Sequence, residues 1–154
     1  MARVRGKIVA QGDTPEQALN ASQQSRHKER PEIIFMFPLL PLVKRVMDVL
    51  PPDQEIYLVG GAVRDLLLSR PSPDLDFSLP ANGISIARKV ANALSADFLA
   101  LDEERDTGRV IITNEDGSRT YLDFAVYRGA NLTEDLRGRD FTINAIAYNL
   151  RDEA

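Results

Sequence analysis

Apolar residues recur every three or four positions in two stretches of the chain, as they do along an amphipathic helix. The first stretch lies between Pro38 and Pro51, and the second covers residues 83–95. The recurring positions are Leu39, Leu42, Val43, Val46, Met47 and Leu50 in the first, and Ile84, Ala87, Ala91 and Leu94 in the second. A third helical pattern, AVRDLLLSR, follows two glycines. We therefore expect three helices after residue 38.

Short runs rich in apolar, β-branched and aromatic residues predict strands between and after these helices. Glycine, proline or polar residues that favour turns separate the runs. The runs are EIYLVG, DLDFSL, FLAL, RVIIT, TYLDFAVY and the closing FTINAIAYNL. The polar segment EDLRGRD, which precedes the last run, is assigned neither a helix nor a strand. The pattern indicates a domain that mixes helices and strands.

The first 38 residues show a pattern of their own. RVRGKIVAQG alternates like a strand, a helix is expected to begin beside Pro15, and IIFMF is a short apolar run that predicts a second strand. We therefore expect a small strand–helix–strand module of unknown role in residues 1–38, and a second domain in residues 39–154. A module of about 38 residues buries little core by itself, so we expect it to pack on the rest of the chain or on a partner.

The composition limits the chemistry that is available. The 154 residues include no cysteine, which excludes disulfides, thiolate zinc sites and thiol nucleophiles. Any metal ion must therefore bind to carboxylates or to the lone histidine, His27, which we interpret as an ordinary surface residue. No apolar run approaches the roughly 20 residues that a membrane span needs, and the first residues do not form a signal peptide. We expect a cytoplasmic protein that binds no membrane.

The charge is unevenly distributed. The net charge is −4, yet residues 1–31 hold six basic and three acidic residues, so the excess of acidic residues lies in the rest of the chain. A negative surface is the wrong sign for a protein that grips a phosphate backbone over a wide face. If the chain handles nucleic acid, we expect the contact to be local.

Two aspartates begin the run DLDFSL. Alternation along a strand places Asp74 and Asp76 on one face, roughly 6 to 7 Å apart, while Leu75 and Phe77 point into the core. Adjacent like charges repel each other, so the pair is favourable when a cation lies between the carboxylates. An isolated pair of this kind is more often a turn capped by aspartates after Pro73.

A glycine pair upstream strengthens the cation interpretation. Gly60 and Gly61 lie where a strand passes into a helix, and Arg64 falls on the first turn of that helix. Glycines allow the close approach of a ligand, and unpaired N–H groups at a helix start favour an anion. The alternative is a tight turn with a surface arginine. The turn and the Asp74–Asp76 pair would be adjacent if their strands pair, and together they would suit a triphosphate with Mg²⁺.

A third carboxylate lies on a later strand. In TYLDFAVYR, Leu122, Phe124 and Val126 can face the core while Asp123 and Ala125 face the other side. Asp123 is either a solvent-facing residue or the residue that completes a metal site. Two divalent ions held by three carboxylates would lower the pKa of an attacking hydroxyl and neutralise a leaving pyrophosphate.

Four segments of the chain resemble a known family in order and spacing: LVGGAVRDLLL, PDLDF, LDFAVYR and EDLRGRDFTINAIA. They are similar to the head domain of class II tRNA nucleotidyltransferases, the CCA-adding enzymes, and of the related bacterial poly(A) polymerases, in the polymerase β nucleotidyltransferase superfamily. The resemblance covers roughly residues 55 to 150. It implies the α/β (α+β) fold of that head domain, which we expect to have a mixed, mostly antiparallel sheet of about five strands flanked by helices.

The resemblance assigns the candidate residues to three groups. The group that resembles the triphosphate-binding motif is Gly60, Gly61 and Arg64. The group that resembles the catalytic carboxylates and Mg²⁺ ligands is Asp74, Asp76 and Asp123. The group that resembles the ribose-contacting motif, which helps to select ribonucleotides, is Arg139, Asp140 and Asn144.

Four further positions receive separate expectations. The polar stretch from Asp102 to Arg109 lies where the family has a flexible loop. Asp65 is expected to make a structural ion pair or helix contact. Asn144 could equally be a buried polar group that ties the last strand to its neighbours, and the role of Arg128 is left open.

The function that the resemblance implies is template-independent transfer of nucleotides from ATP or CTP to the 3′-hydroxyl of RNA by two-metal catalysis. The expected RNA is a tRNA whose 3′ CCA end is added or repaired. The family's neck, body and tail, which read the base and hold the tRNA, have no counterpart in this sequence, so we expect weak activity or none from this chain alone. The alternatives are a poly(A) polymerase head domain and a nucleotide-binding or interaction module without catalysis. The oligomeric state is not specified.

Overall fold

Two compact units, residues 1–38 and residues 39–154, make up the computed structural model of the chain. The structure describes residues 2–4, 7–10, 17, 21, 32–33, 41–68, 70, 72 and 74–151. Among them, no helix is both long enough and apolar enough to span a membrane.

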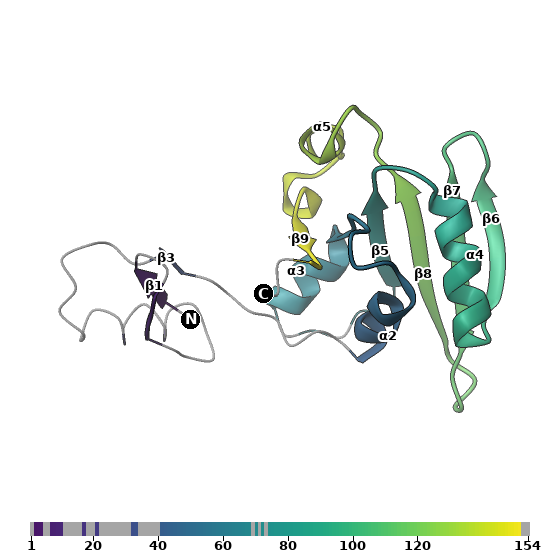
Figure 1. The fold of residues 1–154 in the computed structure, drawn as a ribbon, viewed down its shortest axis with the longest axis horizontal. Helices are drawn as coiled ribbons and strands as arrows, with labels where there is room; N and C mark the ends of the chain where they lie inside the picture. Colours follow the sequence, from purple (N-terminus) through teal and green to yellow (C-terminus); the bar gives the residue numbers. More distant parts are fainter. Residues whose placement is uncertain are drawn as a thin grey trace. The chain divides into compact units, whose positions relative to one another are not determined.

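The larger unit is built on a six-stranded sheet in the order β6-β7-β8-β5-β4-β9 (Figure 1). Its strands are β4 (Tyr57–Val59), β5 (Asp74–Leu79), β6 (Asp97–Asp102), β7 (Thr107–Thr113), β8 (Arg119–Val126) and β9 (Ala147–Asn149). The central strands β5 and β8 pair in parallel, and the other neighbours are antiparallel. The predicted mixed, mostly antiparallel sheet is confirmed. It has six strands where about five were expected, and one of them is the short strand β9.

The three helices predicted after residue 38 are confirmed. They are α2 (Pro41–Val49), α3 (Gly61–Leu67) and α4 (Gly83–Leu94). Two further segments are helical: α5 (Leu132–Arg137) and the 3₁₀ helix η1 (Thr142–Asn144). No element had been assigned to EDLRGRD, and α5 covers part of it. The side chain of Asn131 accepts a hydrogen bond from the backbone N–H of Glu134, and this N-cap starts α5 within a polar segment.

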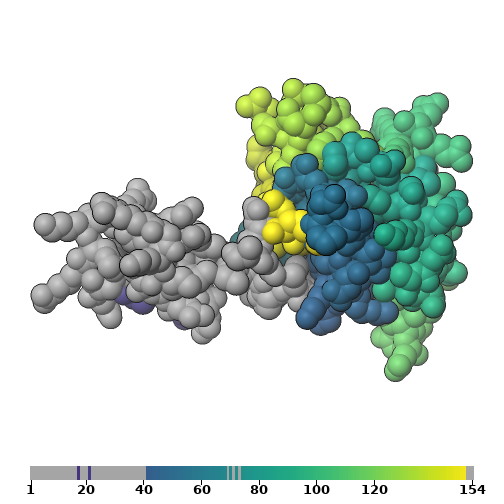
Figure 2. Space-filling view, in the orientation of Figure 1, coloured from purple at the N-terminus to yellow at the C-terminus, as the bar shows by residue number. Residues whose placement is uncertain are grey.

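The core lies on the face of the sheet that α4 covers. Leu75, Phe77, Leu122 and Phe124 are almost fully buried there, and the rings of Phe77 and Phe124 stack with their centroids 4.7 Å apart. Helix α2 contacts α4, and in Figure 2 the two helices lie next to each other on one face. Because side chains alternate along a strand, the residues between these four face the opposite side of the sheet.

The turn between β6 and β7 is attached to the start of α4. The carboxylate of Asp106 accepts hydrogen bonds from the backbone N–H groups of Gly83, at 3.0 Å, and Ile84, at 2.9 Å. Position 83 also has no room for a side chain, because a Cβ there would overlap the backbone oxygen of Asp106 and lie 2.8 Å from that of Phe124. The stretch from Asp102 to Arg109, which lies where the family has a flexible loop, contains a four-residue turn, and its two ends belong to β6 and β7.

The smaller unit contains a three-stranded antiparallel sheet in the order β2-β1-β3. Its strands are β1 (Ala2–Val4), β2 (Lys7–Ala10) and β3 (Glu32–Ile33). RVRGKIVAQG therefore forms two paired strands where one was predicted.

Other predictions for this unit fall partly on residues outside the described ones. Gln17 and Ala21 are helical, as expected for a helix that begins beside Pro15. The other residues of the predicted helix, His27 and the apolar residues 34–37 lie outside the described residues.

Candidate active site

The register of the central strands brings two of the candidate carboxylates side by side. In the parallel pair β5–β8, Asp76 lies opposite Asp123, and in the antiparallel pair β4–β5, Asp76 lies opposite Val59, the residue before Gly60. Both aspartates are half-buried, on the face opposite to Phe77 and Phe124. The predicted alternation of carboxylates and core residues on β5 and β8 is confirmed.

Asp76 lies in surroundings that disfavour its charge. Burial raises the pKa of its carboxyl group, and the negative charges of Asp123 and Asp74 raise it further. The charges of Arg139 and Arg109 act in the opposite direction but do not outweigh them. A carboxylate held in this way attracts a cation, because a positive ion would offset the repulsion.

Asp123 is held by an arginine on the neighbouring strand. Arg109 on β7 lies opposite Asp123 on β8, and its Nε and Nη2 donate hydrogen bonds of 2.7 Å to the two carboxylate oxygens. The same contact raises the pKa of the Arg109 guanidinium. Sequence reasoning missed this partner because Arg109 was counted as the end of a polar stretch. Alternation along RVIIT could have placed it on the same face as Asp123.

Gly60 lies directly beside Asp76 and Arg139. Its φ of +71° belongs to the left-handed region that glycine adopts without strain. A Cβ at this position would lie 3.1 Å from Nη1 of Arg139 and 3.7 Å from Oδ2 of Asp76. The absence of a side chain therefore lets the Arg139 guanidinium and the Asp76 carboxylate lie close to the backbone at the strand end. The predicted proximity of the glycine turn to β5 is confirmed.

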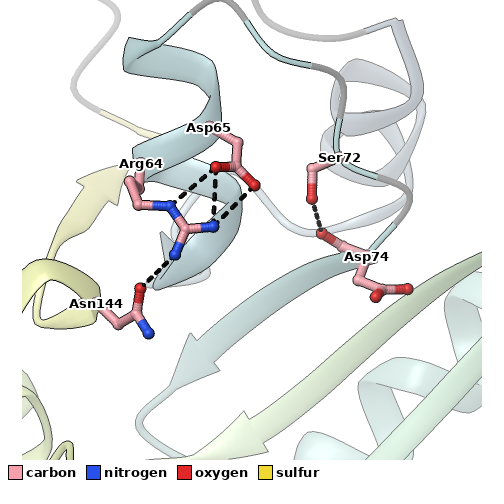
Figure 3. A network of polar contacts seen from close by, with 5 residues as sticks. All are labelled: Arg64, Asp65, Ser72, Asp74 and Asn144. Carbon is pink, nitrogen blue, oxygen red and sulfur yellow. Dashed lines mark hydrogen bonds and ion pairs between the residues drawn. The ribbon is translucent and has the colours of Figure 1, made fainter. Parts of the chain in front are cut away.

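Arg64 on α3 joins two segments that are distant in sequence (Figure 3). Its guanidinium donates to both carboxylate oxygens of Asp65, at 2.9 and 3.0 Å, and to Oδ1 of Asn144, at 2.9 Å. The predicted structural ion pair of Asp65 is thus confirmed, and the contact fits the interpretation of Asn144 as a tie between the end of the chain and its neighbours. In Figure 3 the exposed carboxylate of Asp74 points away from Arg64 and Asn144.

A buried acid that sequence reasoning missed lies behind the ribose-motif residues. Asp135 on α5 is only 3% exposed, and its carboxylate forms an ion pair of 3.2 Å with Arg139. The hydroxyl of Ser78 and the backbone N–H of Arg128 also donate to it. Without α5 in the prediction, no periodicity indicated that Asp135 points inward. Arg128, whose role was open, contributes its backbone N–H here.

An open cleft of about 880 Å³ collects most of these side chains. It brings together five of the nine predicted site residues: Asp76, Asp123, Arg139, Asp140 and Asn144. The turn between β6 and β7 and the segment after β8 form further walls, which include Asp102, Arg105, Asp106, Tyr127 and Arg128. Asp74, Gly60, Gly61 and Arg64 are not among the lining residues.

The carboxylates are not arranged as a closed metal site. In the part of the chain that the structure describes, no three His, Cys, Asp or Glu side chains are placed to hold one metal ion. Asp123 is engaged by Arg109, and Asp74 is exposed at the start of β5. The donor chemistry nevertheless fits a hard cation such as Mg²⁺, which prefers carboxylate oxygens. Burial and the neighbouring carboxylates make the charged form of Asp76 unfavourable, and a bound cation would offset this repulsion.

Residues 56–154 match the family described as the poly A polymerase head domain. The chain belongs to this family. The match confirms the resemblance inferred from the four sequence motifs.

Relatives of this chain include proteins named as tRNA nucleotidyltransferases. This chain is 45% identical over 93 residues to the CC-adding tRNA nucleotidyltransferase of Geobacter sulfurreducens. The match covers 60% of this chain and 21% of that protein. The chain is 44% identical over 105 residues to the CC-adding tRNA nucleotidyltransferase of Synechocystis sp., and this match covers 67% of this chain and 24% of that protein. The chain therefore spans about a fifth to a quarter of the length of these relatives.

Solved structures of such enzymes contain the same fold. One is a crystal structure of a tRNA nucleotidyltransferase complexed with a primer tRNA and an incoming ATP analogue. It matches 65% of this chain and 29% of its own chain with 35% identity and a TM-score of 0.56. The α/β head-domain fold predicted from the sequence is confirmed.

Proposed function

We propose that this head domain catalyses nucleotidyl transfer from ATP or CTP to the 3′-hydroxyl of a tRNA, in the addition or repair of the CCA end. The observation that carries the proposal is the register of β5 and β8, which sets Asp76 beside Asp123 next to the side-chain-free Gly60. The names of the relatives support tRNA as the acceptor, and the absence of cysteine fits action in the reducing cytoplasm.

The proposed Mg²⁺ ligands are Asp74, Asp76 and Asp123. When bound there, the ion would supply charge neutralisation at the transferred phosphate and the leaving pyrophosphate, and a lowered pKa for the attacking hydroxyl. Asp76 and Asp123 hold their carboxylates on adjacent positions of two central strands, so the protein itself fixes their separation. Asp123 becomes available as a ligand once its ion pair with Arg109 opens.

Other residues of the site are proposed to bind and orient the nucleotide. Gly60 and Gly61 are proposed to let phosphate groups approach the backbone at the strand end, and Arg64 brings a positive charge to the same turn. Arg139, Asp140 and Asn144 are proposed to contact the ribose. Orientation of the two reactants is a large part of catalysis in a reaction that needs no covalent enzyme intermediate.

The test is incorporation of radiolabelled nucleotide into a tRNA that lacks its 3′ CCA. We expect slow, Mg²⁺-dependent incorporation of CTP, ATP or both by the 154-residue chain. A short addition of at most three nucleotides supports CCA-type synthesis, whereas long tracts of A indicate a poly(A) polymerase. Because weak activity or none is expected of this chain alone, the same assay is run with the chain joined to the neck, body and tail of a relative. Binding of Mg²⁺–ATP without any incorporation by that longer protein would contradict the proposal and favour a nucleotide-binding module.

Replacing Arg109 with glutamine is expected to tighten divalent-ion binding about fivefold. The ion pair with Asp123 has to open before the carboxylate can bind a cation, and a partly exposed pair of this kind is worth about 1 kcal/mol. Titration with Mn²⁺ followed by electron paramagnetic resonance measures the affinity directly. Arg119→Gln, at an exposed position at the start of β8, is the control, and equal or weaker Mn²⁺ binding by Arg109→Gln would contradict the expectation.

A further inference from the structure

Asp135 links three segments of the larger unit through one buried carboxylate. Its Oδ2 accepts from the hydroxyl of Ser78 on β5, at 3.3 Å, and from Nη2 of Arg139, at 3.2 Å. Its Oδ1 accepts from the backbone N–H of Arg128, at 3.1 Å, in the segment after β8. A carboxylate that is 3% exposed is costly unless it is paired, so these contacts fix its position.

One nitrogen of the Arg139 guanidinium is held by Asp135, and another has no hydrogen-bond partner among the described residues. Nη2 is bound to Asp135, and Nη1 lies 3.1 Å from the position that a Cβ on Gly60 would take. Nε is buried and has no hydrogen-bond partner in the described part of the chain. A buried donor without an acceptor is unfavourable by about 1–3 kcal/mol. The residue also lines the cleft, so an acceptor oxygen of a bound molecule can approach the guanidinium from that side.

The ion pair with Asp135 also determines which carboxylate the Arg139 guanidinium binds. Arg139 is close enough to Asp76 for its charge to lower the pKa of that carboxyl group. A guanidinium without the Asp135 charge would be drawn to the nearby negative charge of Asp76. Direct pairing there would occupy the carboxylate and remove the arginine from its place beside Gly60.

We propose that Asp135 is a positioning residue that holds the Arg139 guanidinium beside Gly60, ready to donate to an oxygen of the bound nucleotide. The inference rests on the proposed function, because it names a residue that acts through the nucleotide site. Asp135 itself does not touch the nucleotide. Its role is to keep the cation in one orientation and away from Asp76.

The test compares Asp135→Asn with Ser78→Ala. The asparagine retains an acceptor for the Arg128 N–H but loses the charge that pairs with Arg139. The alanine removes a hydrogen bond to the same carboxylate oxygen and leaves the ion pair in place, so it is the matched control. We expect the Kd of Mg²⁺–ATP, measured by calorimetry, to rise about fivefold in Asp135→Asn and to stay within twofold of the wild type in Ser78→Ala.

An NMR resonance of the Arg139 side chain reports directly on the surroundings of its guanidinium. In ¹⁵N-labelled protein, the Nε–H resonance of Arg139, assigned by its loss in Arg139→Lys, is expected to be protected from solvent exchange and to shift when Mg²⁺–ATP is added. Asp135→Asn should remove the protection, and Ser78→Ala should keep it. In an Arg139→Gln background, Asp135→Asn should weaken Mg²⁺–ATP binding no further.

Several outcomes would overturn the inference. One is an Arg139 resonance that is unchanged in Asp135→Asn. Another is an equal change in the Kd of Mg²⁺–ATP in Asp135→Asn and Ser78→Ala. A third is that the effects of Asp135→Asn and Arg139→Gln on this Kd add up. If the wild type binds no Mg²⁺–ATP, the proposed function fails, while the protection of the resonance still tests whether Asp135 holds Arg139. If the asparagine variant does not fold, Asp135→Glu, which keeps the charge but shifts the carboxylate, is expected to change the resonance and the affinity in the same direction.

Discussion

Asp76→Asn is expected to lower nucleotidyl transfer by about 1000-fold and, at the same time, to stabilise the protein. The loss of activity follows from the proposed role of Asp76 as a ligand of the ion that offsets the charge of the reacting phosphates; removing one such electrostatic group commonly costs 10²- to 10³-fold or more. The gain in stability follows from the half-buried position of the carboxylate beside Asp123 and Asp74. Opposite effects on activity and stability are typical of a residue kept for function.

The sign of the stability effect depends on pH. The folded protein raises the pKa of Asp76 above the usual value of 3.8, so the folded state favours the protonated form. The stability that this preference provides is present in acid and is lost as the pH rises above the ordinary range of an aspartate. The advantage of Asp76→Asn should therefore be small near pH 3 and largest at neutral pH.

The measurements are single-turnover incorporation of labelled nucleotide and urea unfolding without divalent ions at several pH values. Asp116→Asn is a control of opposite sign, because hydrogen bonds from Ser118 lower the pKa of Asp116 and favour its charged form. That variant should keep its activity and lose a little stability at neutral pH. An Asp76→Asn protein that is active, or that is less stable than the wild type at pH 7, would refute the assignment.

Gly83→Ala is expected to destabilise the larger unit by about 3 kcal/mol or more. The added methyl group would overlap the backbone oxygen of Asp106 and lie 2.8 Å from the backbone oxygen of Phe124. Neither oxygen is at the end of a flexible side chain. Asp106 is also tied to Gly83 and Ile84 by its carboxylate, and Phe124 belongs to a central strand. The clash can be relieved only by moving the start of α4 away from the sheet.

Urea unfolding of Gly83→Ala and Gly138→Ala provides the measurement and its control. Gly138 has ordinary helical backbone angles, and a Cβ there would meet its nearest atoms at 3.5 and 3.6 Å. Alanine at position 138 should therefore change the free energy of unfolding by less than about 1 kcal/mol in either direction. Similar effects of the two substitutions would show that the contact at Gly83 is not the cause.

Local periodicity was sufficient to predict most of the larger unit and one face of its site. The pattern of DLDFSL places Asp76 between two core residues, and the pattern of TYLDFAVY does the same for Asp123. Each prediction needs only the alternation of a strand, which is a property of neighbouring residues. The same reasoning placed α4 at Gly83–Leu94, within one residue of the predicted range.

Partners across the sheet could not be predicted in this way. The hydrogen bonds between Arg109 and Asp123 depend on which residue of β7 faces which residue of β8, and this register is set by the turn between them. Asp135 was missed because α5 starts from a polar cap and has no apolar periodicity. Its contact with Ser78 joins residues that are 57 positions apart, a distance over which sequence patterns carry no information.

The parallel pairing of β5 and β8 has a consequence for the order of folding. These strands are neighbours in the sheet, but α4, β6 and β7 lie between them in the chain, whereas β6–β7 and β7–β8 are local hairpins. Contacts of high sequence separation cost more loop-closure entropy and form more slowly. We therefore expect Asp76 and Asp123 to meet after the hairpins and α4 have assembled. A cation that needs both carboxylates can act only on the nearly complete domain, so it should slow unfolding far more than it accelerates folding.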